Sequence, residues 1–388
     1  MEVYCQESQE ITALKEKKNL PKRSNILNLT PIWKDGLLRS NTRLRHLEDL
    51  SEEIKYPIIL PKRHPVTKLM IIVKYHHESE GHRMGGDLPV LKAVLGVPDK
   101  ITCQQGTTRS GDEALCILLK RFAYPCRYSD MVSRFGRNPS ELCLIFNEAL
   151  DFLYERHHHR LQSWNQPFLS PEILQIYADA IHNKGAPLDN CFGFVDGTVR
   201  QIARPKYHQK VMYNGHKRVH SIKFQSVVLP NGLIGNLAGP YEGKRHDSVI
   251  LQESGLLTNL RQIAFYNNNP LCIYGDPAYP LGVHLQAPFR ERELTPAMAE
   301  FNREMSRVRV SVEWMFGNIT KYFSFVDFKR QMKLHLSPVG KIYTVAALLQ
   351  NAHTCLYENI VSHFFDLKPP STMNISGNTH SLSLSCEF

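Results

Sequence analysis

The chain has 388 residues, of which 42% are hydrophobic and 10% aromatic, so it can bury a large core and is not globally disordered. Its formal net charge of +10 at pH 7 favours a polyanionic partner, nucleic acid before membrane. No apolar run is long enough to span a bilayer, no signal peptide opens the chain, and nine scattered cysteines without a Cys-x-x-Cys pair favour a reducing compartment.

The first 86 residues differ in composition and pattern from the rest of the chain. Residues 1–50 are polar and mixed in charge, as in a solvated arm. Further on, Thr67 can cap a helix, and histidines spaced five or six residues apart could supply two zinc nitrogens. These histidines are His76, His77 and His82.

With Asp35–Arg39 upstream, this segment resembles, over roughly residues 20–86, the amino-terminal part of integrases from BEL/Pao-type retroelements. In that family a downstream Cys-x-x-Cys completes a zinc site. No such pair follows here, so we do not expect a tetrahedral zinc site, and we expect residues 1–86 to be a poorly ordered remnant.

Residues 88–185 predict a helical domain. Apolar spacing indicates helices over 113–122, 127–135, 139–156 and from 171 to 183, with Asn138 and Pro139 opening the third. The short glycine-containing turn before Asn138 suggests a helix-turn-helix that presents Arg134 and Arg137 to DNA. The alternative is a plain bundle with solvated arginines. The run of histidines 157–159 is typical of a solvated helix end.

Three carboxylates stand out in the second half. The apolar run Cys191–Val195 leads into Asp196 and Gly197, either as a turn with a solvated acid or as a buried strand that delivers a carboxylate. A second apolar run ends at Asp276. Glu313 lies at the edge of the apolar stripe of a long helix, where it could enter a site or pair with Arg309.

The elements between these acids predict their relative order. Strands 221–229 and 233–239 are joined by an Asn-Gly turn, and a helix over 249–255 and a polar link over 263–272 lead to the Asp276 strand. Thr295 and Pro296 then begin the long helix, and a further apolar helix covers 337–359. This order predicts an α/β, RNase H-like fold with a mixed sheet.

Basic residues follow the first acid closely. Lys217, Arg218, Lys244 and Arg245 are candidates for DNA phosphates, against the alternative of a solvated loop. His246 and Asp247 are auxiliary candidates at the rim of the site, although Asp247 could equally be a helix N-cap.

Four segments together resemble PIF/Harbinger-type DDE transposases over about residues 88–365. They are Phe194–Thr198, His246–Ser248, Gly275–Leu281 and Val312–Gly317. The resemblance implies that residues 186–365 form a DDE nuclease domain in which Asp196, Asp276 and Glu313 hold two Mg²⁺ or Mn²⁺ ions. It also implies cutting and joining of DNA at transposon ends, a nuclear location, homo-oligomers when active and a Myb-like DNA-binding partner.

Two further interpretations of the chain are open. A domesticated, non-catalytic protein could keep this fold only to bind DNA or recruit partners, and a retroelement integrase would rest on the amino-terminal remnant alone. The presence of all three acids favours the enzyme. The serine-, asparagine- and threonine-rich tail, residues 366–388, is expected to be disordered.

Overall fold

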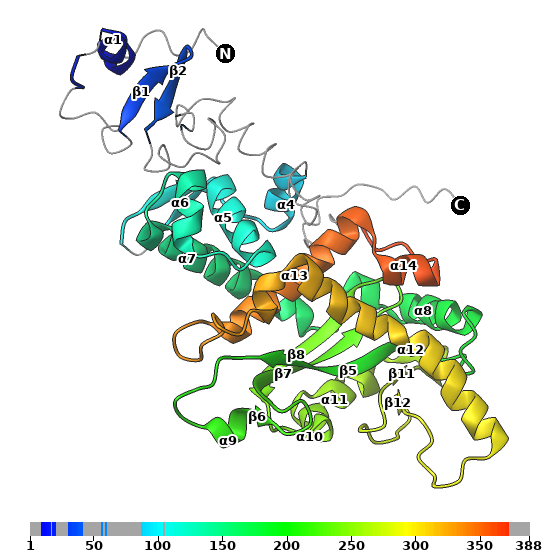
Figure 1. Ribbon diagram of the computed structural model, residues 1–388. Helices are drawn as coiled ribbons and strands as arrows, with labels where there is room; N and C mark the ends of the chain where they lie inside the picture. Colours follow the sequence, from blue (N-terminus) through cyan, green and yellow to red (C-terminus); the bar gives the residue numbers. More distant parts are fainter. Residues whose placement is uncertain are drawn as a thin grey trace, which may run out of the picture. The chain divides into compact units, whose positions relative to one another are not determined.

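The computed structural model describes residues 9–16, 18–20, 30–41, 56, 59, 87–103 and 105–371. The chain divides into two compact units, residues 1–78 and 79–388 (Figure 1). The predicted Thr67 cap, the paired histidines and nearly all of the tail lie outside the described residues.

The described part of the first unit contains a helix and a hairpin. These are α1 (Gln9–Lys15), β1 (Pro31–Lys34) and β2 (Leu37–Ser40). Asp35 and Gly36 form the two-residue turn, both with positive φ, as the Asp-Gly turn of a hairpin requires. The Lys15 ammonium lies 4.7 Å from the centre of the Trp33 ring and holds α1 to β1.

The second unit begins with the predicted helices. Ser110 Oγ and Asn138 Oδ1 accept hydrogen bonds from the third residues of α5 and α7, Glu113 and Glu141. The predicted start of α7 is confirmed, and α5 begins at Gly111, two residues before its predicted start. The elements are α4 (Leu88–Val94), β3 (Lys100–Thr102), β4 (Thr108–Ser110), α5 (Gly111–Ala123), α6 (Tyr128–Phe135), α7 (Pro139–His157), η4 (His158–Leu161), η5 (Pro167–Leu169) and α8 (Pro171–Asn183). The role of α6 and α7 as a helix-turn-helix stays a prediction.

One expectation in this region is wrong. His157 is not part of a solvated helix end: it is buried, and its Nε2 lies 2.8 Å from the carbonyl oxygen of Leu95. Burial, with the nearby Arg160 and Arg156, lowers the pKa of His157 to about 4, so its ring is neutral at pH 7. His157 therefore joins α7 to the chain after α4.

A six-stranded mixed sheet forms the centre of the second unit (Figure 1). Its strands are β5 (Cys191–Gln201), β6 (Tyr213–Asn214), β7 (Val219–Val228), β8 (Ile234–Glu242), β11 (Cys272–Tyr274) and β12 (Leu285–Gln286). The order is β12-β11-β5-β7-β6, with β8 also paired to β7. β5 is parallel to β11 and antiparallel to β7. A mixed sheet of this kind is compatible with an RNase H-like domain.

Helices cover both faces of the sheet. Phe194 of β5 belongs to a core shared with α12 (Pro296–Tyr322), α13 (Val339–Tyr357) and α14 (Ile360–Phe365). Its neighbour Val195 belongs to the core formed with α8, α10 (Asp247–Glu253) and α11 (Leu256–Ile263). Successive strand residues point to opposite faces, so β5 is buried on both sides, as its continuous apolar run predicts.

The structure differs from the sequence prediction in three local features. β5 does not end near Asp196 but continues for five more residues to Gln201. The helix α11 was not predicted, and the polar link contains a small hairpin, β9 (Phe265–Tyr266) and β10 (Asn269–Pro270). Short connecting elements are α9 (Gln209–Met212) and η6 (Ser324–Asp327). Among the described residues, no helix has both the length and the apolar character to cross a membrane.

Candidate active site

The parallel register of two strands brings Asp196 and Asp276 to the same level of the sheet. Phe194 pairs with Tyr274 as the last residues of the β5–β11 ladder. Asp196 and Asp276 each follow two residues later. Because β11 ends at Tyr274, the rest of β5 has no strand on that side, which leaves room beside the Asp196 carboxylate. The two acids therefore both lie just beyond the point where the parallel β5–β11 ladder ends, Asp196 within β5 and Asp276 after β11.

Asp196 is largely buried and strongly influenced by charge. Its pKa is raised to about 6: burial is the largest cause, Arg309 and the backbone N–H of Gly197 act in the opposite direction, and the carboxylates of Asp276 and Asp247 raise it by smaller amounts. The Arg309 guanidinium lies 3.0 Å from Asp196 Oδ2, and the Gly197 N–H donates to Oδ1 at 2.8 Å. The site thus holds more negative charge than its own cations offset.

Asp247 reaches the site from α10, on the opposite face of the sheet from α12. One interpretation expected Asp247 to be the N-cap of this helix, and that is wrong. The N-cap is His246, which caps the helix with its backbone and has an exposed side chain. The Asp247 Oδ1 atom lies 2.6 Å from the buried Lys223 ammonium. A Cβ at Gly197 would lie 2.6 Å from the same oxygen, so only glycine allows Asp247 to lie against β5.

The Tyr279 side chain lies near all three aspartates. It is completely buried, and burial together with Asp247, Asp196 and Asp276 raises its pKa well above the ordinary value. A Cβ at Gly275 would lie 2.7 Å from the Tyr279 ring, so the glycine before Asp276 lets this ring pack beneath the acid. Sequence reasoning placed Tyr279 in a motif without giving it a role in the site.

Glu313 is exposed on α12, one turn after Arg309. The alternative in which Glu313 pairs with Arg309 is wrong, because the Arg309 guanidinium pairs with Asp196 instead. In the part of the chain that the structure describes, no three His, Cys, Asp or Glu side chains stand close enough together to hold a metal ion. Asp276 and Asp247 lie near enough to Asp196 to raise its pKa, whereas Glu313 is not among the groups that act on it.

The predicted DNA-contacting cations fall into two groups. Lys217 and Arg218 lie at the tip of the β6–β7 hairpin, which Asn214 ties to the segment of Lys244 by donating to the Gly243 carbonyl at 3.0 Å. Lys217, Arg218 and Lys244 are exposed. Arg245, in contrast, pairs with Glu242 and Glu253 at 3.1 and 3.2 Å.

The two helical candidates also differ. Arg134 is exposed on α6. Arg137 is 8% exposed, and its guanidinium donates to both Glu113 carboxylate oxygens at 2.8 and 3.1 Å. A DNA phosphate could reach Arg137 only after this pair opens.

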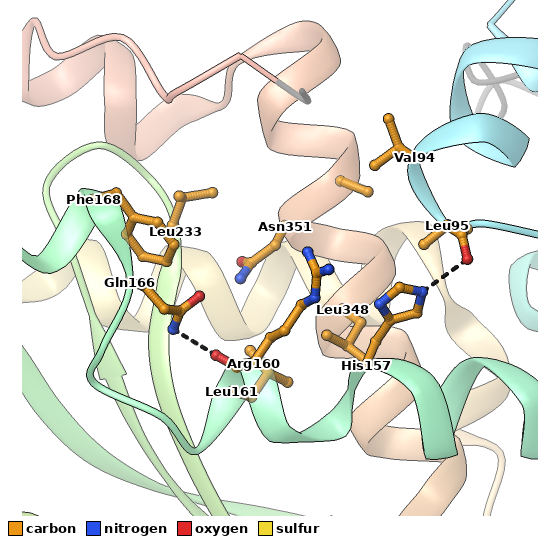
Figure 2. A pocket seen from close by; sticks show the side chains of 11 residues that line it. Val94, Leu95, His157, Arg160, Leu161, Gln166, Phe168, Leu233, Leu348 and Asn351 are labelled. Atoms are coloured by element: carbon orange, nitrogen blue, oxygen red, sulfur yellow. Dashed lines mark hydrogen bonds between the residues drawn. The ribbon is translucent and has the colours of Figure 1, made fainter. Parts of the chain in front are cut away.

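A cavity of about 40 Å³ lies elsewhere, between α7, η4 and α13 (Figure 2). Figure 2 shows His157 and Arg160 facing Asn351 across it. This volume holds on the order of three water molecules. None of the predicted site residues lines the cavity, so the acids form a separate site.

Comparison with known families gave a match over the segment in which these acids lie. The family described as DDE superfamily endonuclease matches residues 195–351, which is less than half of the chain. The comparisons with curated proteins and with solved structures gave no significant match. The matched span contains Asp196, Asp247, Asp276 and Glu313, and it supports a DDE-type transposase or nuclease.

Proposed function

We propose that this protein is a metal-dependent DNA transposase of the PIF/Harbinger type, which cuts and joins strands at transposon ends. The observation that carries the proposal is the parallel register that brings Asp196 and Asp276 together within the matched span. A nuclear location, a homo-oligomeric active form and a Myb-like DNA-binding partner belong to the same proposal.

The residues of the site fit a hard divalent cation. Carboxylate oxygens are the ligands that Mg²⁺ and Mn²⁺ prefer. Burial is the main cause of the raised pKa of Asp196, so its ionised form is short of solvation that a bound cation would replace, and Arg309 already supplies one positive group to this carboxylate. Asp196 and Asp276 would hold the metal ions, and Glu313, which is not clustered with them in the metal-free fold, would complete the site as the third ligand.

Each side chain then has a definable task. Ions held by Asp196 and Asp276 would supply Lewis-acid activation of an attacking water or DNA 3′-hydroxyl and charge stabilisation of the leaving 3′-oxygen. Asp196 and Asp276 fix where this chemistry occurs, because Asp196 lies in the central strand β5 and Asp276 follows its parallel partner β11 by two residues. Lys217, Arg218 and Lys244 bind the phosphates that lead to the site.

Cleavage is expected to fall as the pH drops through about 6, because protonated Asp196 cannot serve as a metal ligand. The pKa of this carboxyl lies about two units above its ordinary value, so the loss begins well above pH 4. The check is the initial rate between pH 4.5 and 8 at a fixed Mn²⁺ concentration below saturation, because saturating metal would hold this carboxylate ionised. A rate that stays constant down to pH 4.5 would contradict this assignment.

Glu313→Gln is expected to reduce cleavage by at least a hundredfold and to change the unfolding free energy by less than about 0.5 kcal/mol, since Glu313 is exposed. Glu300→Gln, which removes an equally exposed acid from the same helix, is the matched control and should cut normally. Equal rates for the two variants would remove Glu313 from the site.

The proposed function itself is tested by the metal requirement. The substrate is DNA that carries the inverted repeats flanking the gene, with random-sequence duplex as the control. Strand cleavage is expected with Mg²⁺ or Mn²⁺ and not with EDTA. Binding without cleavage under every metal condition would leave only a DNA-binding protein on this fold.

A further inference from the structure

A second basic surface lies on the loop between η6 and α13, the orange segment before α13 in Figure 1. Its residues Lys329, Arg330 and Lys333 are exposed, and the sequence from 323 to 338 contains a single acid, Asp327. In the described part of the chain, none of these three cations forms an ion pair with a carboxylate.

Buried contacts fix the backbone of this loop. Met332 is buried, and the buried Arg121 guanidinium donates to Gln331 Oε1 at 2.7 Å. Ser337 Oγ donates to the Gln331 carbonyl at 2.9 Å. The residues between the cations therefore hold the backbone, while the cations themselves extend into solvent. Such an arrangement lowers the entropy lost when a partner binds.

The loop also adjoins a second exposed basic segment. The Ala203 N–H donates to the Met332 carbonyl at 2.9 Å, which joins the loop to the chain directly after β5. Arg204 and Lys206 follow and are both exposed. Arg204 donates to Gln209 Oε1 at 2.9 Å, and the Lys206 ammonium lies 5.1 Å from the Tyr207 ring, so neither is neutralised by an acid there.

Exposed cations on other elements of the described chain are often neutralised. Arg303 and Arg307 pair with Glu300 and Glu304 along α12. The half-buried Lys341 also pairs with an acid, Asp151, at 2.7 Å. The two adjoining loops thus concentrate positive charge that acidic side chains do not offset.

We propose that Lys329, Arg330 and Lys333, together with Arg204 and Lys206, bind the phosphate backbone of duplex DNA. This proposal rests on the proposed function, which makes DNA the polyanion in question, and it adds the cations of the loop before α13, which sequence reasoning missed. Contacts to phosphates carry no sequence information, so the surface adds affinity for any duplex. It positions the DNA whose ends are cut at the acids.

The test is the salt dependence of DNA binding by the full chain. Fluorescence anisotropy with a random-sequence 30-base-pair duplex, in EDTA, gives the dissociation constant from about 50 to 300 mM KCl. The variant is Lys329→Gln, Arg330→Gln, Lys333→Gln. Loss of three phosphate contacts is expected to reduce the slope of log K against log salt by about 2.7 and to weaken binding at least tenfold at 100 mM KCl.

A matched control variant distinguishes the effect of losing this surface from the effect of lowering the net charge. Lys184→Gln, Arg303→Gln, Arg307→Gln removes the same number of cations from positions where they pair with acids, and it should keep the wild-type slope. Equal losses in both variants, or no loss in either, would overturn the proposal. Thermal melting checks that each variant is folded. If the triple variant unfolds, Arg330→Gln alone is used in its place, and it is expected to reduce the slope by about 0.9.

The outcome is separable from that of the nuclease. Cleavage by a wild type whose binding slope does not depend on this surface would leave the proposed function intact and remove the surface. A binding slope that depends on this surface, in a protein that never cuts DNA, would keep the surface and remove the proposed nuclease function.

Discussion

Replacing Asp196 by Asn is expected to abolish DNA cleavage and, at the same time, to raise the melting temperature of the metal-free protein by roughly 5 °C at pH 7. The two effects have one cause. Asp196 is an acid held in a buried place beside other acids, which suits a metal ligand and costs stability when no metal is present.

The sign follows from proton linkage. The pKa of Asp196 is about 6 in the folded protein and 3.8 without its surroundings, so the folded state holds the proton more tightly. The stability that this carboxyl contributes is fully present below pH 4 and is lost as the pH rises through about 6. The shift corresponds to about 3 kcal/mol, an upper value for the variant because Asn also loses the Arg309 pair.

The measurement is thermal unfolding in EDTA at pH 4 and pH 7 for wild type and Asp196→Asn. The difference should be near zero at pH 4 and largest at pH 7. Added Mg²⁺ should raise the melting temperature of the wild type and leave the variant unchanged. A variant less stable than wild type at pH 7 would show that Asp196 is a structural acid.

The second large effect concerns the pair formed by Lys223 and Asp247. Asp247→Asn is expected to destabilise the fold by about 3 kcal/mol, because the Lys223 ammonium, 7% exposed, keeps its charge and loses its carboxylate. The carbonyl oxygen of Arg245, 2.9 Å away, would remain as its acceptor.

Adding Lys223→Met should restore most of this loss, since the double variant no longer buries a charge. Urea unfolding of the wild type, both single variants and the double variant gives the coupling energy. Losses that simply add would mean that the pair does not stabilise the site. Cleavage by the rescued double variant then reports whether Asp247 acts beyond its structural task.

Much of the fold could be predicted because it depends on local signals. Asn138 with Pro139, and Thr295 with Pro296, begin α7 and α12 as expected, and both capping side chains accept the predicted backbone hydrogen bonds. The apolar run of β5 and the Asn-Gly turn before β8 also predicted their strands. The end of β5 was missed because Thr198–Gln201 gain their strand conformation from pairing with β7, a nonlocal cause.

The site was predictable only in part. Asp196 and Asp276 follow apolar runs, and that signal is visible in the sequence. That they meet depends on the β5–β11 register, which no local pattern records. Arg309 was read as a partner for Glu313 because four residues separate them on one helix, and the competing partner, Asp196, is distant in sequence. Lys223 resembles any strand lysine until α10 brings Asp247 to it.

The most direct test of the DNA-cutting site compares wild type with Asp276→Asn. The Asp276 Oδ1 atom accepts a hydrogen bond from the Ala278 N–H at 2.9 Å, and an Asn oxygen can keep that bond, so the turn is preserved. We expect Mn²⁺-dependent cleavage to fall by at least a thousandfold while the DNA dissociation constant in EDTA changes less than twofold. Equal cleavage by the two proteins would contradict the account.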